Sequence, residues 1–94
     1  MIKQRFISTI AAITLSLSVA APAMAVTEHV DGGVWNHGTN KVDVWSYYKH
    51  AHKSHKSSAS GKRLYQSGCQ VAKVEAIASG PKKWTNNQAY YGFC

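Results

Sequence analysis

The chain of 94 residues carries 11 lysines and arginines against four aspartates and glutamates, which gives a formal net charge of +7. A chain of this length has room for one small domain with a thin core, and this argues against the enclosed cleft of an enzyme. The basic charge favours an anionic partner, such as a bacterial envelope, phospholipid head groups or a pyrophosphate.

The first 25 residues have the three-part order of a secretory signal peptide. Lys3 and Arg5 make a basic start, an uncharged and mostly apolar run follows, and residues 23–25 read Ala-Met-Ala, which fits an Ala-x-Ala cleavage site. We expect residues 1–25 to be removed, with an uncleaved anchor helix as the alternative. The secreted, extracellular domain is then 26–94, and its net charge falls from +7 to +5 with the loss of Lys3 and Arg5. Export argues against a nucleic-acid partner.

Alternating side chains predict two strands at the start of the mature domain. In residues 34–37, Trp35 and His37 share one face, and Gly38-Thr39-Asn40 has the composition of a turn. Residues 41–49 alternate again and are rich in β-branched and aromatic residues, which favours strand over helix. Aromatic residues fall on both faces of this second strand. The pattern therefore suits a sheet packed in a sandwich.

The rest of the mature chain is interpreted as short strands and loops. Residues 26–31 form a polar lead, and residues 50–60, which lack large apolar side chains, form an exposed edge strand that continues into a loop. Alanines make helix a competitor over residues 69–79, where the surrounding pattern favours strand. Further strands are expected at 61–66, 82–85 and 88–94. The predicted fold class is all-β, a small antiparallel β-sandwich of about six short strands.

Two cysteines, Cys69 and Cys94, remain in the mature chain, and export places them where disulfides persist. We expect one disulfide bond between them, worth about 3 kcal/mol by the entropy of closing the loop. The bond could form within one chain or join two molecules in a homodimer. A catalytic or metal-binding thiol lacks support because the chain has no Cys-x-x-Cys pair.

Four histidines gather in the same part of the chain. His37, His50, His52 and His55 could supply imidazole ligands to Zn²⁺ or Cu²⁺, but no carboxylate lies nearby in the sequence to orient the rings, so we expect no metal and no cofactor. The alternative is a strip of exposed cationic residues. Because the unperturbed pKa of histidine is near 6.5, such a strip would bind an anionic target more strongly as the pH falls from about 7.5 to 5.5.

The residue types of a catalytic triad are present in Ser46, His37 and Asp43. Neither a nucleophile elbow nor an oxyanion-hole signature accompanies them. We therefore expect that the protein is not an enzyme.

Three motifs resemble the secreted bacteriocins of the lactococcin 972 family. They are Gly33-Val34-Trp35-Asn36-His37-Gly38, then Trp45-Ser46-Tyr47-Tyr48-Lys49-His50 with His55 five residues later, and Tyr90-Tyr91-Gly92-Phe93 near the end. The resemblance implies a small β-sandwich that acts on related Gram-positive bacteria by binding the cell-wall precursor lipid II and blocking septum formation. It also implies dedicated immunity and transport proteins in the producing cell. The two cysteines and the segment 57–68 depart from the family pattern.

The residues expected to contact the target combine this motif with neighbouring cations: Trp35, His37, Tyr48, Lys49, His50, Lys53, His55 and Lys56. The lysines and histidines would contact the pyrophosphate of lipid II, or another anionic envelope component, and the aromatic rings its apolar parts. Two alternatives to this function belong to other functional classes. A membrane-permeabilising protein would cause leakage from vesicles that lack lipid II, and a non-toxic extracellular metal-binding or envelope-interaction protein would show metal-dependent stability and no growth inhibition.

Overall fold

The computed structural model describes residues 24–94, so the predicted signal peptide lies outside the described residues except for Met24 and Ala25. The strands in chain order are β1 (Met24–Val30), β2 (Gly33–Thr39), β3 (Asp43–His50), β4 (His55–Ser60), β5 (Leu64–Gln66), β6 (Ala76–Pro81) and β7 (Gln88–Phe93). This composition confirms the all-β prediction. Over the described range the chain forms no helix that could cross a membrane.

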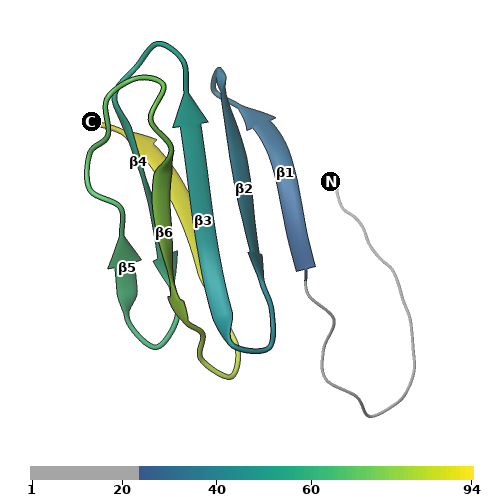
Figure 1. The fold of residues 1–94 in the computed structure, drawn as a ribbon. Helices are drawn as coiled ribbons and strands as arrows, with labels where there is room; N and C mark the ends of the chain where they lie inside the picture. The colour runs from purple at the N-terminus through teal and green to yellow at the C-terminus, as the bar shows by residue number, and fades with distance from the viewer. Residues whose placement is uncertain (1–23) are drawn as a thin grey trace.

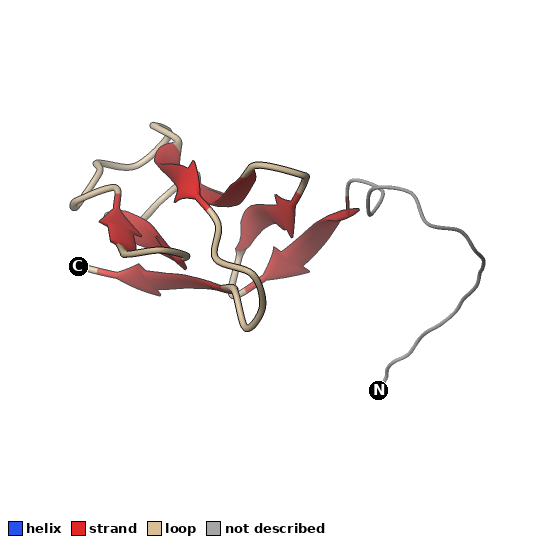
Figure 2. Ribbon diagram, turned by 90° about the horizontal axis from the view of Figure 1, so that it is seen from below, coloured by secondary structure: helices blue, strands red, loops and turns tan. Residues whose placement is uncertain are grey.

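The strands form two antiparallel sheets packed face to face (Figure 1; Figure 2). The larger sheet has the order β1-β2-β3-β6 and the smaller one the order β5-β4-β7. The smaller sheet packs on β3 and β6 and reaches β2 through β7, whereas β1 is an edge strand that pairs only with β2. The inner face of β1 and the adjoining part of β2 therefore project beyond the sandwich.

Strand β1 was not predicted, because residues 26–31 were expected to be a polar lead. Asp31 and Gly32 both adopt left-handed backbone conformations, with φ of 50° and 84°. An Asp-Gly pair in this conformation makes the tight turn that suits a two-residue hairpin loop. The turn pairs Val30 with Gly33 and so continues the sheet by one edge strand.

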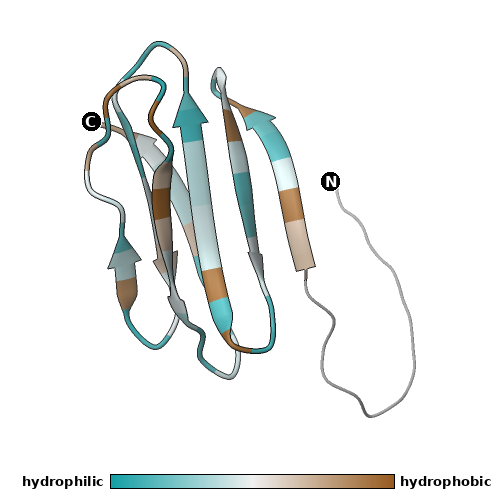
Figure 3. Cartoon of the chain, in the orientation of Figure 1, coloured by the Kyte–Doolittle hydropathy of each residue, from teal (hydrophilic) through white to brown (hydrophobic). Residues whose placement is uncertain are grey.

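The space between the sheets is narrow and largely filled by small side chains. The apolar core consists of Val44, Ala59 and Ala78, with Tyr65 packed against it. Hydrophobic residues lie along the strands as short separate bands (Figure 3). The Ser57 hydroxyl, on β4, lies 2.8 Å from the carbonyl oxygens of Ser46 and Ala76 in the opposite sheet. Polar contacts thus supplement burial in holding the two layers together.

Residues 55–60 form the central strand of the smaller sheet, so the prediction of an edge strand running into a loop was wrong. His55, Ser57 and Ala59 face the interior and are buried, while Lys56 between them is exposed. Hydroxyl and methyl side chains are small enough to let the sheets approach closely. The absence of large apolar residues from this segment was interpreted as a sign of exposure. At this interior position, close packing of the two sheets instead requires small side chains.

Three further predicted strands differ from the structure. Of residues 61–66, only 64–66 form a strand, β5. Over residues 69–79 only the second half is a strand, β6, and its inner face carries the expected alanines Ala76 and Ala78. The first half is irregular because Lys73 adopts a left-handed φ of 76°, which interrupts extended backbone. Residues 82–85 are a loop rather than a strand.

The predicted disulfide bond joins Cys69 to Cys94 within one chain, across a sequence separation of 25 residues. The structure therefore does not have the alternative arrangement, in which a disulfide bond joins two molecules. The bond ties the end of β7 to the segment that follows β5. It anchors a C-terminus that would otherwise fray from the sheet.

Candidate target-binding site

A hollow of about 230 Å³ opens where the inner faces of β1 and β2 project past the smaller sheet. We call it the β1–β2 hollow. It is lined by Met24, Val26, His37, Gly38, Thr39, Val44, Asn87, Gln88 and Ala89. Apolar side chains thus share the wall with an imidazole, a hydroxyl and two amides. Such a lining can contact both the apolar and the hydrogen-bonding parts of a ligand.

His37 is held in place on the wall of this hollow by two contacts. Its Nε2 lies 2.7 Å from Oε2 of Glu28 on β1, and its ring stacks on that of Trp35 with the centroids 3.8 Å apart. The His37 side chain is 23% exposed and that of Glu28 is 42% exposed. The sequence reasoning found no carboxylate near the histidines, and this was wrong for His37, because the hairpin brings β1 alongside β2.

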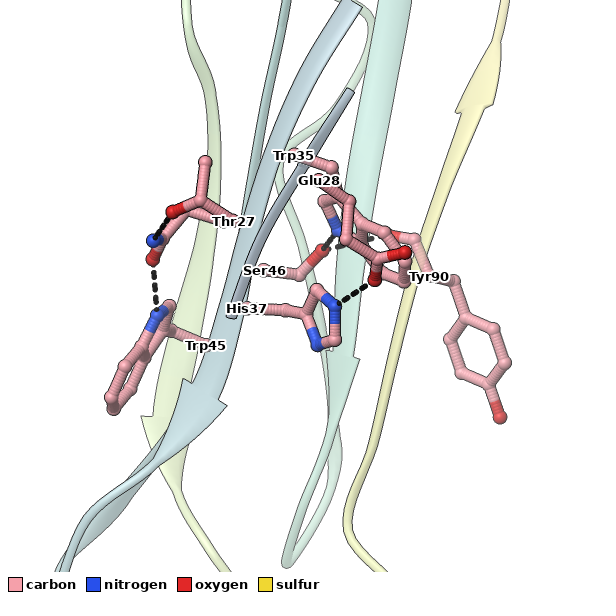
Figure 4. A network of polar contacts seen from close by, with 8 residues as sticks. Thr27, Glu28, Trp35, His37, Trp45, Ser46 and Tyr90 are labelled. Atoms are coloured by element: carbon pink, nitrogen blue, oxygen red, sulfur yellow. Dashed lines mark hydrogen bonds and ion pairs between the residues drawn. The ribbon is translucent and has the colours of Figure 1, made fainter. Parts of the chain in front are cut away.

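Trp35, Ser46 and Tyr90 link three strands behind His37 (Figure 4). The Trp35 indole Nε1–H donates to Oγ of Ser46 at 2.9 Å, and the Ser46 hydroxyl donates to the carbonyl of Tyr90 at 2.8 Å. Ser46 is fully buried. Its hydroxyl is engaged, and Asp43 lies on the outer side of β3, so the residues considered for a catalytic triad do not come together.

A second polar chain runs over the outer face of the larger sheet. Asn36 accepts from the indole of Trp45 at 2.8 Å and donates to the hydroxyl of Thr27 at 2.8 Å (Figure 4). The Trp45 ring lies against Gly38, where an added Cβ would come within 2.8 Å of it. Glycine at this motif position therefore lets the indole lie across β2.

Three of the residues expected to contact the target lie in the interior. Tyr48 and His55 have no exposed surface and His50 is 5% exposed. The Tyr48 hydroxyl donates to the carbonyl of Val30 at 2.9 Å, which ties β3 to the end of β1. In this structure these side chains support the fold and offer no surface to a partner.

His50 and His55 satisfy backbone groups around the turn between β3 and β4. Nδ1 of His50 accepts from the backbone N–H groups of His52 and Lys53, each at 3.0 Å. His55 lies 2.7 Å through Nδ1 from the carbonyl of Lys53 and 2.6 Å through Nε2 from the carbonyl of Val74. Carbonyl oxygens only accept, so a ring nitrogen that carries a proton donates to the carbonyl beside it.

The lysines expected at the site do not form one strip. Lys49 lies on the outer face of β3 and Lys56 on the outer face of β4, and these strands belong to opposite layers. Lys53 lies in the turn between them, with its Nζ 5.2 Å from the centroid of the Phe93 ring. Within residues 24–94, no three His, Cys, Asp or Glu side chains are placed to hold a metal ion.

Tyr91 makes the contact with the clearest dependence on pH. Its hydroxyl donates to Oδ2 of Asp31 at 2.7 Å, and this hydrogen bond, with burial as a smaller cause, raises the pKa of Tyr91 to about 12. Burial, together with the charge of Asp31, also raises the pKa of Tyr48. Both shifts favour the neutral phenol in the folded state.

A raised tyrosine pKa predicts alkaline sensitivity. The stabilisation is fully present below the ordinary pKa of 10 and is lost as the pH rises through about 12, because the unfolded chain ionises first. We expect the urea midpoint of Tyr91→Phe to fall less between about pH 9 and 11.5 than that of the wild type. Tyr90→Phe, which changes an exposed neighbour, is the control, and equal slopes for all three proteins would contradict the assignment.

The fold and the site define a small disulfide-bonded β-sandwich with an open hollow lined by both apolar and polar side chains. Residues 31–91 match the model of the family described as Bacteriocin (Lactococcin_972). The match covers more than half of the chain, so the protein belongs to this family of bacteriocins, which are secreted. No curated protein and no solved structure matches the chain.

Glu28 and the hollow were missed by the sequence reasoning. A signal for them was present in Asp31-Gly32, a dipeptide typical of a two-residue hairpin turn. Such a turn pairs residues 24–30 with 33–39 and brings Glu28 into reach of His37.

Proposed function

We propose that this bacteriocin inhibits the growth of related Gram-positive bacteria by binding lipid II and blocking septum formation, with the β1–β2 hollow as the binding site. The observation that carries this proposal is that the motif residues His37 and Gly38 form part of the wall of an open hollow. Lipid II joins a sugar-peptide head to an isoprenyl tail through an anionic pyrophosphate. The hollow has room for part of the head group.

His37 is the side chain best placed to contact such a ligand. Glu28 accepts a hydrogen bond from Nε2 and Trp35 stacks on the ring, so the orientation of the imidazole is held before binding. A side chain held in this way loses little rotamer entropy when a ligand arrives. Its partial exposure leaves the ring accessible from the hollow.

Signal-peptide cleavage after Ala25 would change the rim of the hollow. Met24 and Ala25 pair with Thr39 and Gly38 in β1 and would leave with the signal peptide. The new α-ammonium group would stand on Val26, the residue that pairs with His37. A positive charge at this point would favour a phosphate oxygen over a neutral group.

Titration of the secreted, oxidised protein with lipid II, followed by tryptophan fluorescence, tests the proposal. With lipid II carried in neutral phosphatidylcholine vesicles, we expect saturable binding that phosphatidylcholine alone does not reproduce, since Trp35 packs on the imidazole in the hollow. His37→Gln should weaken this binding about tenfold, equivalent to the loss of one hydrogen bond. His29→Gln, on the exposed outer side of β1, should leave it unchanged.

Three results would count against this proposal. An equal response to lipid II and to plain anionic vesicles, with leakage of the vesicle contents, would favour membrane permeabilisation. Stability that rises with added Zn²⁺, without growth inhibition, would favour the non-toxic metal-binding alternative. Equal loss in the two histidine variants would move the binding site away from the hollow.

A further inference from the structure

Five basic residues come together at one end of the sandwich, the lower end in Figure 1. They lie in or beside the three loops at residues 40–42, 61–63 and 82–87, and we call this group the basic end: Lys41, Lys62, Arg63, Lys82 and Lys83. Two backbone hydrogen bonds connect the loops. The N–H of Lys62 donates to the carbonyl of Pro81 at 3.0 Å, and the N–H of Lys82 donates to that of Val42 at 2.9 Å.

The positive charge of the basic end is not neutralised by the protein. The one ion pair within residues 24–94 joins His37 to Glu28, so none of the five basic side chains is paired with a carboxylate. Asp43, at the start of β3, is the one carboxylate among these loops in the described part of the chain. Asp31 and Glu75 lie at the opposite end.

Large apolar side chains project among these cations. Trp84 is 94% exposed, and Val42 and Leu64 are more than half exposed. A tryptophan left almost wholly in water is uncommon, because its burial is strongly favourable. The other two tryptophans, Trp35 and Trp45, are half-buried and donate their indole N–H to protein oxygens.

The loop that carries Trp84 has a defined conformation. The Asn87 side chain accepts from the backbone N–H of Lys83 at 2.9 Å and donates to the carbonyl of the same residue at 3.0 Å. Asn86 adopts a left-handed φ of 62°, which asparagine tolerates better than most residues. These contacts close the loop and hold the indole outward.

We propose that the basic end docks on an anionic phospholipid bilayer, with Trp84 at the level of the head groups. Indole rings favour the membrane interface, and lysine and arginine side chains bind a negatively charged leaflet through its surface potential. A single tryptophan with unpaired cations around it provides both contacts on one surface. Docking of this kind is peripheral and requires no pore.

This contact orients the molecule for the proposed function. Asn87, which closes the Trp84 loop, also lines the β1–β2 hollow. Docking by the basic end would therefore turn the hollow towards the surface where lipid II head groups lie. That orientation rests on the proposed function, whereas the membrane contact stands on the charges and the exposed tryptophan alone.

Vesicles that contain no lipid II test the membrane contact separately. The secreted, oxidised protein would be sedimented with phosphatidylcholine vesicles, with or without about 30% phosphatidylglycerol. We expect binding to the anionic vesicles only. Lys82→Gln/Lys83→Gln should weaken it roughly 30-fold, because each basic residue near such a surface contributes about fivefold. Lys49→Gln/Lys56→Gln removes the same charge from the two outer faces and should weaken it less than threefold.

The fluorescence of Trp84 supplies the second readout. Binding should shift the wild-type emission to shorter wavelength as this indole leaves water, and Trp84→Phe should bind the vesicles without that shift. Failure to bind anionic vesicles, equal weakening in the two lysine variants, or an unchanged shift in Trp84→Phe would each overturn the proposal. Lipid II binding without phospholipid binding would leave the proposed function intact, so the two can fail independently.

Discussion

Replacement of His55 by leucine should lower the free energy of unfolding by about 2 kcal/mol, since a buried acceptor left without a donor costs about 1–3 kcal/mol. His55 is fully buried, and its two ring nitrogens lie within 2.7 Å of the carbonyls of Lys53 and Val74. Leucine has similar bulk but no donor. Urea unfolding monitored by circular dichroism would measure the loss.

His52→Leu is the matched control for this substitution. His52 lies three residues earlier, is exposed in the turn, and should change the free energy of unfolding by less than about 0.5 kcal/mol when replaced. If both leucine variants unfolded at the wild-type midpoint, His55 would not be the group that satisfies these carbonyls.

Loss of the disulfide bond should lower the free energy of unfolding by about 3 kcal/mol, the entropy of closing a loop of this length. Cys69 and Cys94 are separated by 25 residues, and the loop between them includes β6 and β7. A domain of this size has only a few kcal/mol of stability, so the reduced protein should be partly unfolded at 37 °C.

Comparison of the oxidised protein with Cys69→Ser/Cys94→Ser in urea would measure this effect. The reduced and alkylated wild type is a second form of the same experiment, and it should agree with the double variant. A double variant that unfolds at the wild-type midpoint would show that the packing of Tyr91 and Phe93 against Tyr48 anchors β7 without the bond.

The strands β2 and β3 could be predicted because their evidence is local. Alternation over residues 34–37 and 41–49 placed Trp35 and His37 on one face of β2, and Tyr48 and Trp45 on opposite faces of β3, as the structure has them. Side-chain direction in a strand has a period of two, whatever the strand pairs with. Neighbouring residues therefore carry this information by themselves.

The place of β4 could not be predicted from local pattern. His55, Ser57 and Ala59 have the composition of an exposed strand, and they are buried because the strand lies at the centre of the smaller sheet, where Ser57 and Ala59 are small enough to let the two sheets pack closely. The same packing makes His50 and His55 structural and separates Lys49 from Lys56. The expected cationic strip assumed that residues close in the chain stay together in space.

The sequence by itself determined the strand alternation, the one available disulfide pair, the basic charge and the bacteriocin family, since composition, spacing and motif are properties of the chain alone. Only the tertiary structure decided that Glu28 meets His37 and that Trp84 stands among five cations. These groupings join loops and strands from separate parts of the chain. Their physical cause is the pairing and packing of whole sheets, whose free energy depends on all strands together and on no single segment.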